Sequence, residues 1–145
     1  MDFKWLKGMD GTTYEDALRI RQTVFIDEQH VPKEIELDGL DDEVYHLVGY
    51  KNGKAAATAR IRFIEDNTLK LQRIATLKEF RGEGLGAKIL EEIKSFAKEH
   101  DIHALVLSSQ EHAVPFYEKS YFEVRGESYM EVGIPHRDMI YLIHP

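Results

Sequence analysis

The sequence contains no cysteine, which excludes disulfide bonds, thiolate metal sites and a cysteine nucleophile. None of its apolar runs approaches the roughly 18 residues that a membrane span needs. The first ten residues also lack the apolar core of a secretory signal. From these absences we expect a cytoplasmic protein with no membrane partner.

Positive charge is also scarce, with 19 lysines and arginines against 26 acidic residues and a formal net charge of −7. A nucleic-acid backbone requires a basic face, so we expect no nucleic-acid partner, although a local basic pocket for a small anion stays compatible. The 145 residues suit one domain, 1–145. The hydrophobic fraction of 43% and the charged fraction of 31% are those of an ordinary globular protein.

Hydrophobic periodicity predicts an alternation of strands and helices along the chain. The short links around Asn52-Gly53 and 65–67 indicate three consecutive antiparallel strands, and the long helix indicates one parallel crossover. Gly133 and Pro135 are expected between the last two strands. Strands are expected at 3–7, 44–50, 54–63, 69–77, 104–109, 121–130 and 139–143, and helices at 14–26, 87–99 and 114–120.

Three glycines at alternate positions, Gly82, Gly84 and Gly86, separate a predicted strand from the long predicted helix. The first N–H groups of a helix lack partners and carry the positive end of its dipole, which favours anions. Glycine lets phosphate oxygens approach the backbone, and Arg81 adds a fork suited to phosphate. The pattern predicts a phosphate or diphosphate site; the simpler interpretation is a glycine-rich turn beside an exposed arginine.

Two familiar phosphate loops do not fit this corner. A P-loop needs Lys-Ser/Thr after its last glycine, whereas Gly86 is followed by Ala87-Lys88. A dinucleotide fingerprint reads G-x-G-x-x-G within repeated βαβ units, whereas this chain has G-x-G-x-G and a single clear crossover.

The spacing Arg81-x-x-Gly84-x-Gly86 resembles the acyl-CoA loop of the GNAT superfamily of N-acyltransferases. The segment HAVPFYEKSYF at 112–122 is similar to that family's N-x-x-A-x-x-F-Y-E-K-x-G-F signature, with His112 in place of the asparagine and Tyr121 in place of the glycine. Residues 19–29 and 133–139 look like the ElaA-like branch, so the resemblance covers nearly the whole chain.

This resemblance implies a GNAT-like mixed α+β fold, with a central, mostly antiparallel twisted sheet of six or seven strands, one parallel crossover and flanking helices. Two parallel strands, here 71–77 and 104–109, would splay apart to admit a pantetheine arm. The amide of Ile74 or Ala75 would face the thioester carbonyl. The implied co-substrate is acetyl-CoA, and the implied cofactor-binding residues are Arg73, Ile74, Ala75, Thr76, Arg81, Gly82, Glu83, Gly84, Leu85, Gly86, Ala87, Phe116, Tyr117 and Lys119.

The implied reaction is direct transfer of the acetyl group to a primary amine, without an acyl-enzyme. Tyr117 occupies the family's general-acid position, and a phenol pKa near 10 lies close to that of a thiol leaving group. The commoner fate of a tyrosine is packing. Glu28, His112 and His136 are candidates for the base, although each residue type is more often structural or exposed.

The acceptor is a small-molecule or peptide amine that the sequence does not identify, in a pocket expected from 21–40 and 131–139. Arg60, Arg62 and Arg73 could recognise an acidic acceptor, but exposed strand arginines are commonplace. We expect no metal, because 100–103 (HDIH) is more simply a solvated helix end.

A homodimer is possible. An alternative function is a catalytically weak CoA- or nucleotide-binding sensor that uses the same phosphate loop. A third is a small structural partner whose glycine loop is only a turn.

Overall fold

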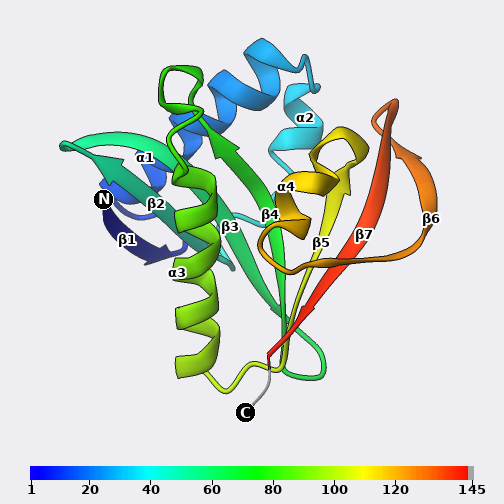
Figure 1. Cartoon of the computed structure of the whole chain (residues 1–145). Coiled ribbons are helices and arrows are strands. Elements are labelled where there is room, and N and C mark those ends of the chain that lie inside the picture. The colour runs from blue at the N-terminus through cyan, green and yellow to red at the C-terminus, as the bar shows by residue number, and fades with distance from the viewer. Residues whose placement is uncertain (144–145) are drawn as a thin grey trace.

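The computed structural model describes residues 1–143 and shows one seven-stranded sheet with helices on both faces (Figure 1). The strands are β1 (Asp2–Lys7), β2 (Tyr45–Lys51), β3 (Lys54–Ile64), β4 (Thr68–Thr76), β5 (Ala104–Gln110), β6 (Glu123–Glu131) and β7 (Ile134–Leu142). The helices are α1 (Thr12–Arg21), α2 (Lys33–Glu36), α3 (Leu85–Glu99) and α4 (Val114–Glu118). Shorter segments are the π-helical η1 (Gln22–Glu28) and the 3-10 turns η2 (Lys78–Phe80) and η3 (Glu111–Ala113).

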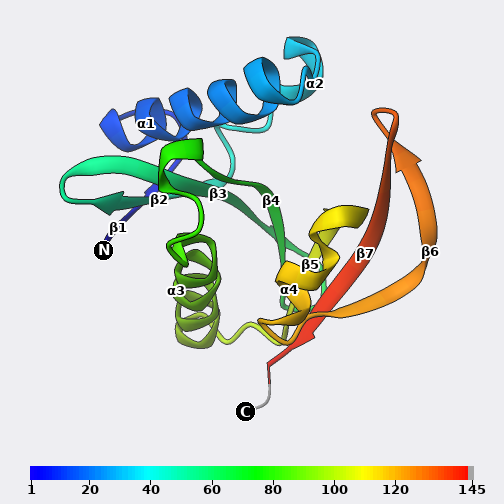
Figure 2. The same cartoon turned by 45° about the horizontal axis from the view of Figure 1, so that its top comes forward.

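The strand order is β1-β2-β3-β4-β5-β7-β6, and every neighbouring pair is antiparallel except β4 with β5. Helices α1 and α2 cover one face of the sheet, and α3 and α4 lie on the opposite face (Figure 2). The predicted α+β class with one parallel crossover is therefore confirmed. Across residues 1–143, no helix is both long and apolar enough to cross a membrane.

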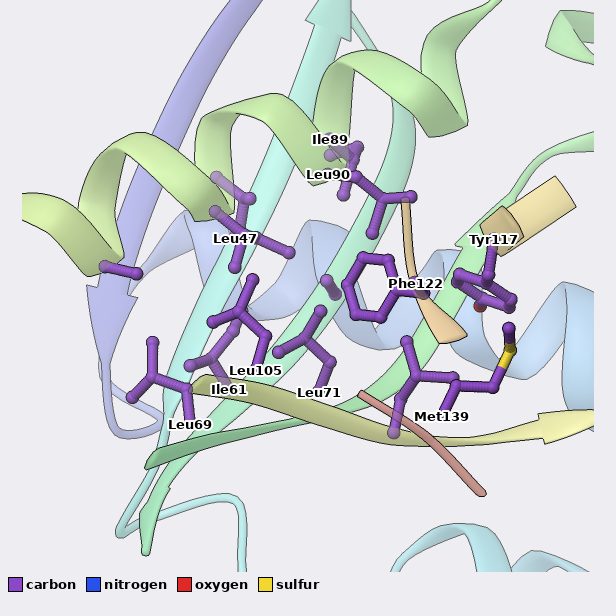
Figure 3. Close-up of a cluster of buried hydrophobic side chains, with 14 of the residues drawn as sticks. Leu47, Ile61, Leu69, Leu71, Ile89, Leu90, Leu105, Tyr117, Phe122 and Met139 are labelled. Carbon is purple, nitrogen blue, oxygen red and sulfur yellow. The ribbon is translucent and has the colours of Figure 1, made fainter. Parts of the chain in front are cut away.

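The main core lies between α3 and the sheet (Figure 3). The helix contributes an apolar stripe at helical spacing, with Ile89 and Ile93 fully buried over Leu47 of β2 and Ile61 of β3. Full burial of one such side chain contributes about 1.5–3 kcal/mol. This stripe is the reason why the glycine corner that precedes α3 has a defined position on the sheet.

The β6–β7 hairpin differs from the sequence-based expectation. Strand β7 begins at Ile134 rather than at 139, and Pro135 lies within it. The turn is made by Val132 and Gly133, whose φ angles are 52° and 72°. Proline is tolerated because β5 ends at Gln110, opposite the next residue, so Pro135 has a strand neighbour only in β6.

Two arginines are fully buried between the sheet and α1, and this corrects the expectation of an exposed Arg60. Arg60 Nη2 lies 2.7 Å from Asp38 Oδ2, and its Nη1 lies 3.1 Å from Asp41 Oδ1. Arg21 Nη1 lies 3.0 Å from the same Asp41 oxygen. Arg60 therefore stabilises the loop before β2 instead of being available to an acceptor.

The third arginine of this cluster comes from β4. Arg73 Nε lies 2.6 Å from Glu36 Oε2, while Arg21 Nε lies 2.6 Å from the other oxygen of that carboxylate. With Arg60, Asp38 and Asp41, three arginines thus face three carboxylates, and the formal charge of this network is zero. A buried charge left without its partner destabilises a fold by about 3–5 kcal/mol, so the network constrains α1, α2, β3 and β4 together.

The network makes the free energy of unfolding decrease at acid pH. Hydrogen bonds from Arg60 hold the pKa of Asp38 well below its usual range. Burial alone would raise the pKa of Asp41, but the charge of Arg21 and the hydrogen bonds to Tyr14, Arg21 and Arg60 outweigh it and lower that pKa. A carboxyl whose folded pKa is depressed contributes stability above its unfolded pKa of about 3.9, and this contribution is lost as the pH falls.

We therefore expect the free energy of unfolding in urea to be nearly constant from about pH 7 to 5 and to fall below about pH 4. Asp38→Asn should lower stability at pH 7 and weaken its decline in acid. The exposed Glu99→Gln should keep the wild-type curve. An Asp38→Asn profile parallel to that of the wild type would contradict this assignment.

Candidate active site

A gap opens in the sheet between β4 and β5. Their parallel pairing runs from Thr68 with Ala104 to Leu71 with Leu107 and then stops, although β4 continues to Thr76 and β5 to Gln110. The two strands diverge toward the end that carries the glycine corner and α4 (Figure 1). The predicted separation of these strands is thus confirmed.

A β-bulge interrupts β4 beside this gap. Thr58 of β3 faces Ala75 and Arg60 faces Gln72, so Arg73 and Ile74 share one position opposite β3. Arg73 adopts a φ of 54°, which a side chain larger than glycine rarely takes. A bulge leaves the backbone of its extra residue without a ladder partner. Backbone polar groups at 73–74 can therefore form hydrogen bonds with a ligand in the gap.

Two of the three glycines form an open loop at the start of α3. Gly82 and Gly84 have φ angles of 82° and 77°, and an added Cβ at either would meet nothing within 4 Å. Gly84 is the N-cap residue of α3, so no capping side chain accepts a hydrogen bond from the first amides of this helix. The loop before the first amides of α3 is thus open at two positions without side chains, Gly82 and Gly84, as an anion seat requires.

Gly86 has a different role from the one expected. An added Cβ at Gly86 would lie 2.9 Å from Cζ of Phe116, so the glycine gives the ring of α4 room to pack on α3. Phe116 is part of the sequence signature, and its contact with Gly86 joins the two motifs in space. The open backbone that the predicted phosphate site requires is found at Gly82 and Gly84.

Arg81 and Glu28 lie together beside the glycine loop. Arg81 Nη1 lies 3.0 Å from Glu28 Oε2, and Arg81 Nε donates a hydrogen bond to the carbonyl of Thr76 at 2.9 Å. Glu28, a candidate base, does not line the cavity described below, whereas Tyr117 does. Glu83 of the loop forms an ion pair with Lys51 of β2.

A cavity of 340 Å³ extends from the gap toward α2. Segments η1, α2, β4, β5, η3, α4 and the β6–β7 hairpin all contribute to its walls. The structure brings together there five residues that sequence analysis singled out: Arg73, Ile74, His112, Tyr117 and His136. Four further polar residues line the cavity that sequence analysis did not single out: Glu36, Gln29, Gln110 and Glu131. Only Gln110 could have been found from the local sequence, because it is a polar residue at the end of a buried strand.

Tyr117 is buried on α4, with 9% of its surface exposed, and lies beside Phe122 and Met139 at one end of the core (Figure 3). Burial raises the pKa of its phenol above the expected value near 10. The hydroxyl therefore stays protonated at any physiological pH. It can donate a hydrogen bond, but it is a weaker acid than the sequence suggested.

His112 lies at the rim of the cavity. Its Nε2 is 2.7 Å from Oε1 of Gln110, whose Nε2 donates to Oε1 of Gln29 at 2.9 Å. Because an amide oxygen accepts hydrogen bonds, Nε2 of His112 carries a proton in this arrangement. These three side chains connect the end of β5 with the end of η1.

The remaining predicted cofactor residues surround the loop or the gap. Leu85 and Ala75 are buried, so these residues can offer a ligand only backbone groups. Lys119 is exposed just after α4. In the described part of the chain, no group of three or more His, Asp or Glu side chains is arranged to hold a metal ion.

The contact of Gly86 with Phe116 can be tested by a double-mutant cycle. Gly86→Ala should lower the thermal unfolding temperature, because the new methyl group would overlap the ring. Phe116→Ala should remove most of that penalty, with a coupling energy of about 0.5–3 kcal/mol. Gly82→Ala serves as the comparison, since its cost is backbone strain alone and should not change with Phe116→Ala.

Comparison with known proteins agrees with this geometry. Residues 10–143 match the acetyltransferase (GNAT) domain family. The chain is 37% identical over 127 residues to the "uncharacterized N-acetyltransferase YjcF" of Bacillus subtilis, covering 87% of this chain and 90% of the relative. It is 31% identical to protein ElaA of Escherichia coli over 126 residues, which is 84% of this chain and 82% of ElaA.

Solved structures share the fold over nearly the whole chain. The crystal structure of an acyl-CoA N-acyltransferase from Pseudomonas aeruginosa superimposes with a TM-score of 0.83 and 28% identity, covering 96% of this chain and 97% of the other. Escherichia coli ElaA gives a TM-score of 0.82 with 27% identity, over 96% and 97% of the two chains. The chain therefore belongs to the GNAT acetyltransferase family, in the branch that includes ElaA.

Proposed function

We propose that this protein transfers the acetyl group of acetyl-CoA directly to a primary amine. The observation that supports this most strongly is the continuity of the site. The start of α3 meets α4 where Gly86 lies against Phe116, and the next residue, Tyr117, lines the cavity, as do residues of β4 and β5 beyond the end of their pairing. The family uses acetyl-CoA, and a chain without cysteine suits transfer without an acyl-enzyme.

In this proposal the amides of 85–87 and the open loop at Gly82 and Gly84 hold the diphosphate. The backbone of β4 at 73–76 pairs with the pantetheine arm. The amide of Ile74 or Ala75, at or next to the bulge, donates to the thioester carbonyl in this proposal. One such preorganised donor lowers a barrier by about 3–4 kcal/mol.

The reaction balances with groups already present. An acceptor ammonium loses one proton, and its nitrogen lone pair forms the C–N bond while the C–S bond breaks. The new amide nitrogen releases a second proton, and the departing thiolate takes up one proton to become the thiol. Tyr117, which burial keeps protonated, donates a hydrogen bond to the departing sulfur.

The alternative is a CoA-binding sensor with little turnover. One observation favours it: the carboxylate of Glu28, a candidate base, pairs with Arg81 outside the cavity. Both functions require acetyl-CoA to raise the unfolding temperature. Measuring free thiol with a panel of amines distinguishes the enzyme from the sensor, because only the enzyme releases free CoA from acetyl-CoA.

Tyr117→Phe tests the proposed donor. We expect kcat to fall by about 100-fold, in the range for loss of one preorganised hydrogen-bond donor, while the Kd for acetyl-CoA changes little. Tyr45→Phe is the matched control, because Tyr45 packs against Trp5 and Phe96 away from the cavity. Stopped-flow and steady-state thiol assays give kcat, and calorimetry gives Kd. An unchanged kcat in Tyr117→Phe would remove the donor role.

Arg81→Gln tests the diphosphate seat. The variant should bind acetyl-CoA about tenfold more weakly, because a charge-assisted contact with phosphate is lost. It should bind S-acetylpantetheine, which lacks the diphosphate, as the wild type does. Arg19→Gln, at an exposed position on α1, provides the charge-matched control. Equal weakening for both thioesters would show that Arg81 acts on the fold rather than on phosphate.

A further inference from the structure

The β6–β7 hairpin brings Glu131 and His136 to the wall of the cavity that contains Tyr117. Their side chains approach to 3.6 Å, between His136 Nε2 and Glu131 Oε2. His136 is buried, with 8% of its surface exposed, whereas the Glu131 side chain is half exposed. The pair thus combines an imidazole fixed in the wall with a carboxylate open to the cavity.

Hydrogen bonding determines which nitrogen of His136 is basic. Nδ1 lies 2.7 Å from the backbone carbonyl of Ile134, and a carbonyl only accepts, so Nδ1 carries the proton of the neutral ring. Nε2 is then left with its lone pair beside Glu131. Two acceptors face each other there, and a group with several N–H donors fits between them.

The carboxylate of Glu131 favours a cation at the same place, although Lys70 also lines the cavity. Glu36 also lines the cavity, but its carboxylate belongs to the neutral network with Arg21 and Arg73. Among residues 1–143, Glu131 has no lysine or arginine partner within ion-pair distance; the nitrogen that approaches it is Nε2 of His136. A neutral His136 therefore leaves the negative charge of Glu131 available to an acceptor.

Neighbouring side chains position the pair. The ring of Tyr129 stacks on that of His136, with centroids 6.1 Å apart and planes at 25°. The Tyr129 hydroxyl donates to Asp138 at 2.6 Å, and Ser108 Oγ donates to Glu131 Oε2 at 3.4 Å. Strands β5, β6 and β7 thus all contribute to holding the imidazole and the carboxylate.

We propose that Glu131 binds the ammonium group of the acceptor and that Nε2 of His136 removes its proton, which makes the substrate class cationic primary amines. This rests on the proposed acetyl transfer. The N–H bond of the ammonium breaks, its proton forms the Nε2–H bond, and the freed lone pair forms the C–N bond as C–S breaks. The resulting imidazolium pairs with Glu131 until it returns its proton to solvent.

Binding of an amine to Glu131 and His136 can be measured without turnover. The probe is n-butylammonium, followed by the imidazole ¹⁵N signals, with His136 assigned by its loss in His136→Gln. The free protein should show the Nδ1–H tautomer, and the probe should shift the His136 signals at millimolar concentration. Glu131→Gln should weaken this binding about tenfold, whereas Glu123→Gln, on the same strand and exposed, should not. Equal shifts with butyrate, or unchanged affinity in Glu131→Gln, would overturn the proposal.

Kinetics test the base with the best acceptor of an alkylamine panel and with hydroxylamine, which is uncharged at neutral pH. His136→Gln should lower kcat/KM for the alkylamine about 100-fold and remove the acidic limb of its pH profile. Hydroxylamine should be affected far less, since it needs no deprotonation before attack. His103→Gln, exposed and outside the cavity, is the control. The titratable or charged groups that line the cavity with His136 are Glu131, Glu36, Arg73, Lys70, His112 and Tyr117. Tyr129 stacks on the His136 ring, and its hydroxyl donates to Asp138.

The two proposals fail in different ways. If no amine releases thiol from acetyl-CoA, acetyl transfer is wrong, while the ¹⁵N titration still decides whether the seat binds ammonium. If thiol is released and His136→Gln keeps the wild-type pH profile with the alkylamine, the role of His136 is wrong and acetyl transfer stands.

Discussion

The site depends on one strained residue of β4. Arg73 adopts a left-handed backbone conformation that costs about 1–3 kcal/mol, and the bulge it forms accompanies the separation of β4 from β5. Its side chain forms an ion pair with the buried carboxylate of Glu36, which Arg21 holds from the other side. We infer that this pairing offsets the strain. The same network that stabilises the fold thus holds the bulged residue beside the gap in the sheet.

The neutral ion-pair network of Arg21, Arg60 and Arg73 with Glu36, Asp38 and Asp41 also affects the electrostatics of the cavity. Because its arginines and carboxylates neutralise one another, they add little net charge to the cavity wall. Outside that network the cavity wall carries Glu131, which lies beside His136, and Lys70, although the whole chain carries a formal charge of −7. Global charge says little about the cavity, whereas the pairing of individual side chains says which ligand charge it accepts.

The two family motifs are one structural unit. Gly86 of the loop gives Phe116 of the signature segment its packing space, and the next residue, Tyr117, is then directed into the cavity. The position of the proposed phosphate seat and that of Tyr117, the proposed hydrogen-bond donor, are therefore coupled through the Phe116 ring and the absent side chain of Gly86. Burial of Tyr117 follows from the same packing and favours hydrogen-bond donation over full proton transfer.

Local patterns in the sequence determined most of the elements. Alternation and helical spacing predicted β1 to β6 and α3 within a few residues, and Asn52-Gly53 predicted the hairpin, because these signals depend on neighbours in the chain. Tertiary structure alone decided that Arg60 is buried, that Glu28 pairs with Arg81, and that β7 includes Pro135. It also decided that Glu131 meets His136 beside Tyr117. Each of these outcomes depends on which distant segments of the chain become neighbours. Burial and charge pairing between such segments exist only in the folded sheet, so local sequence patterns do not reveal them.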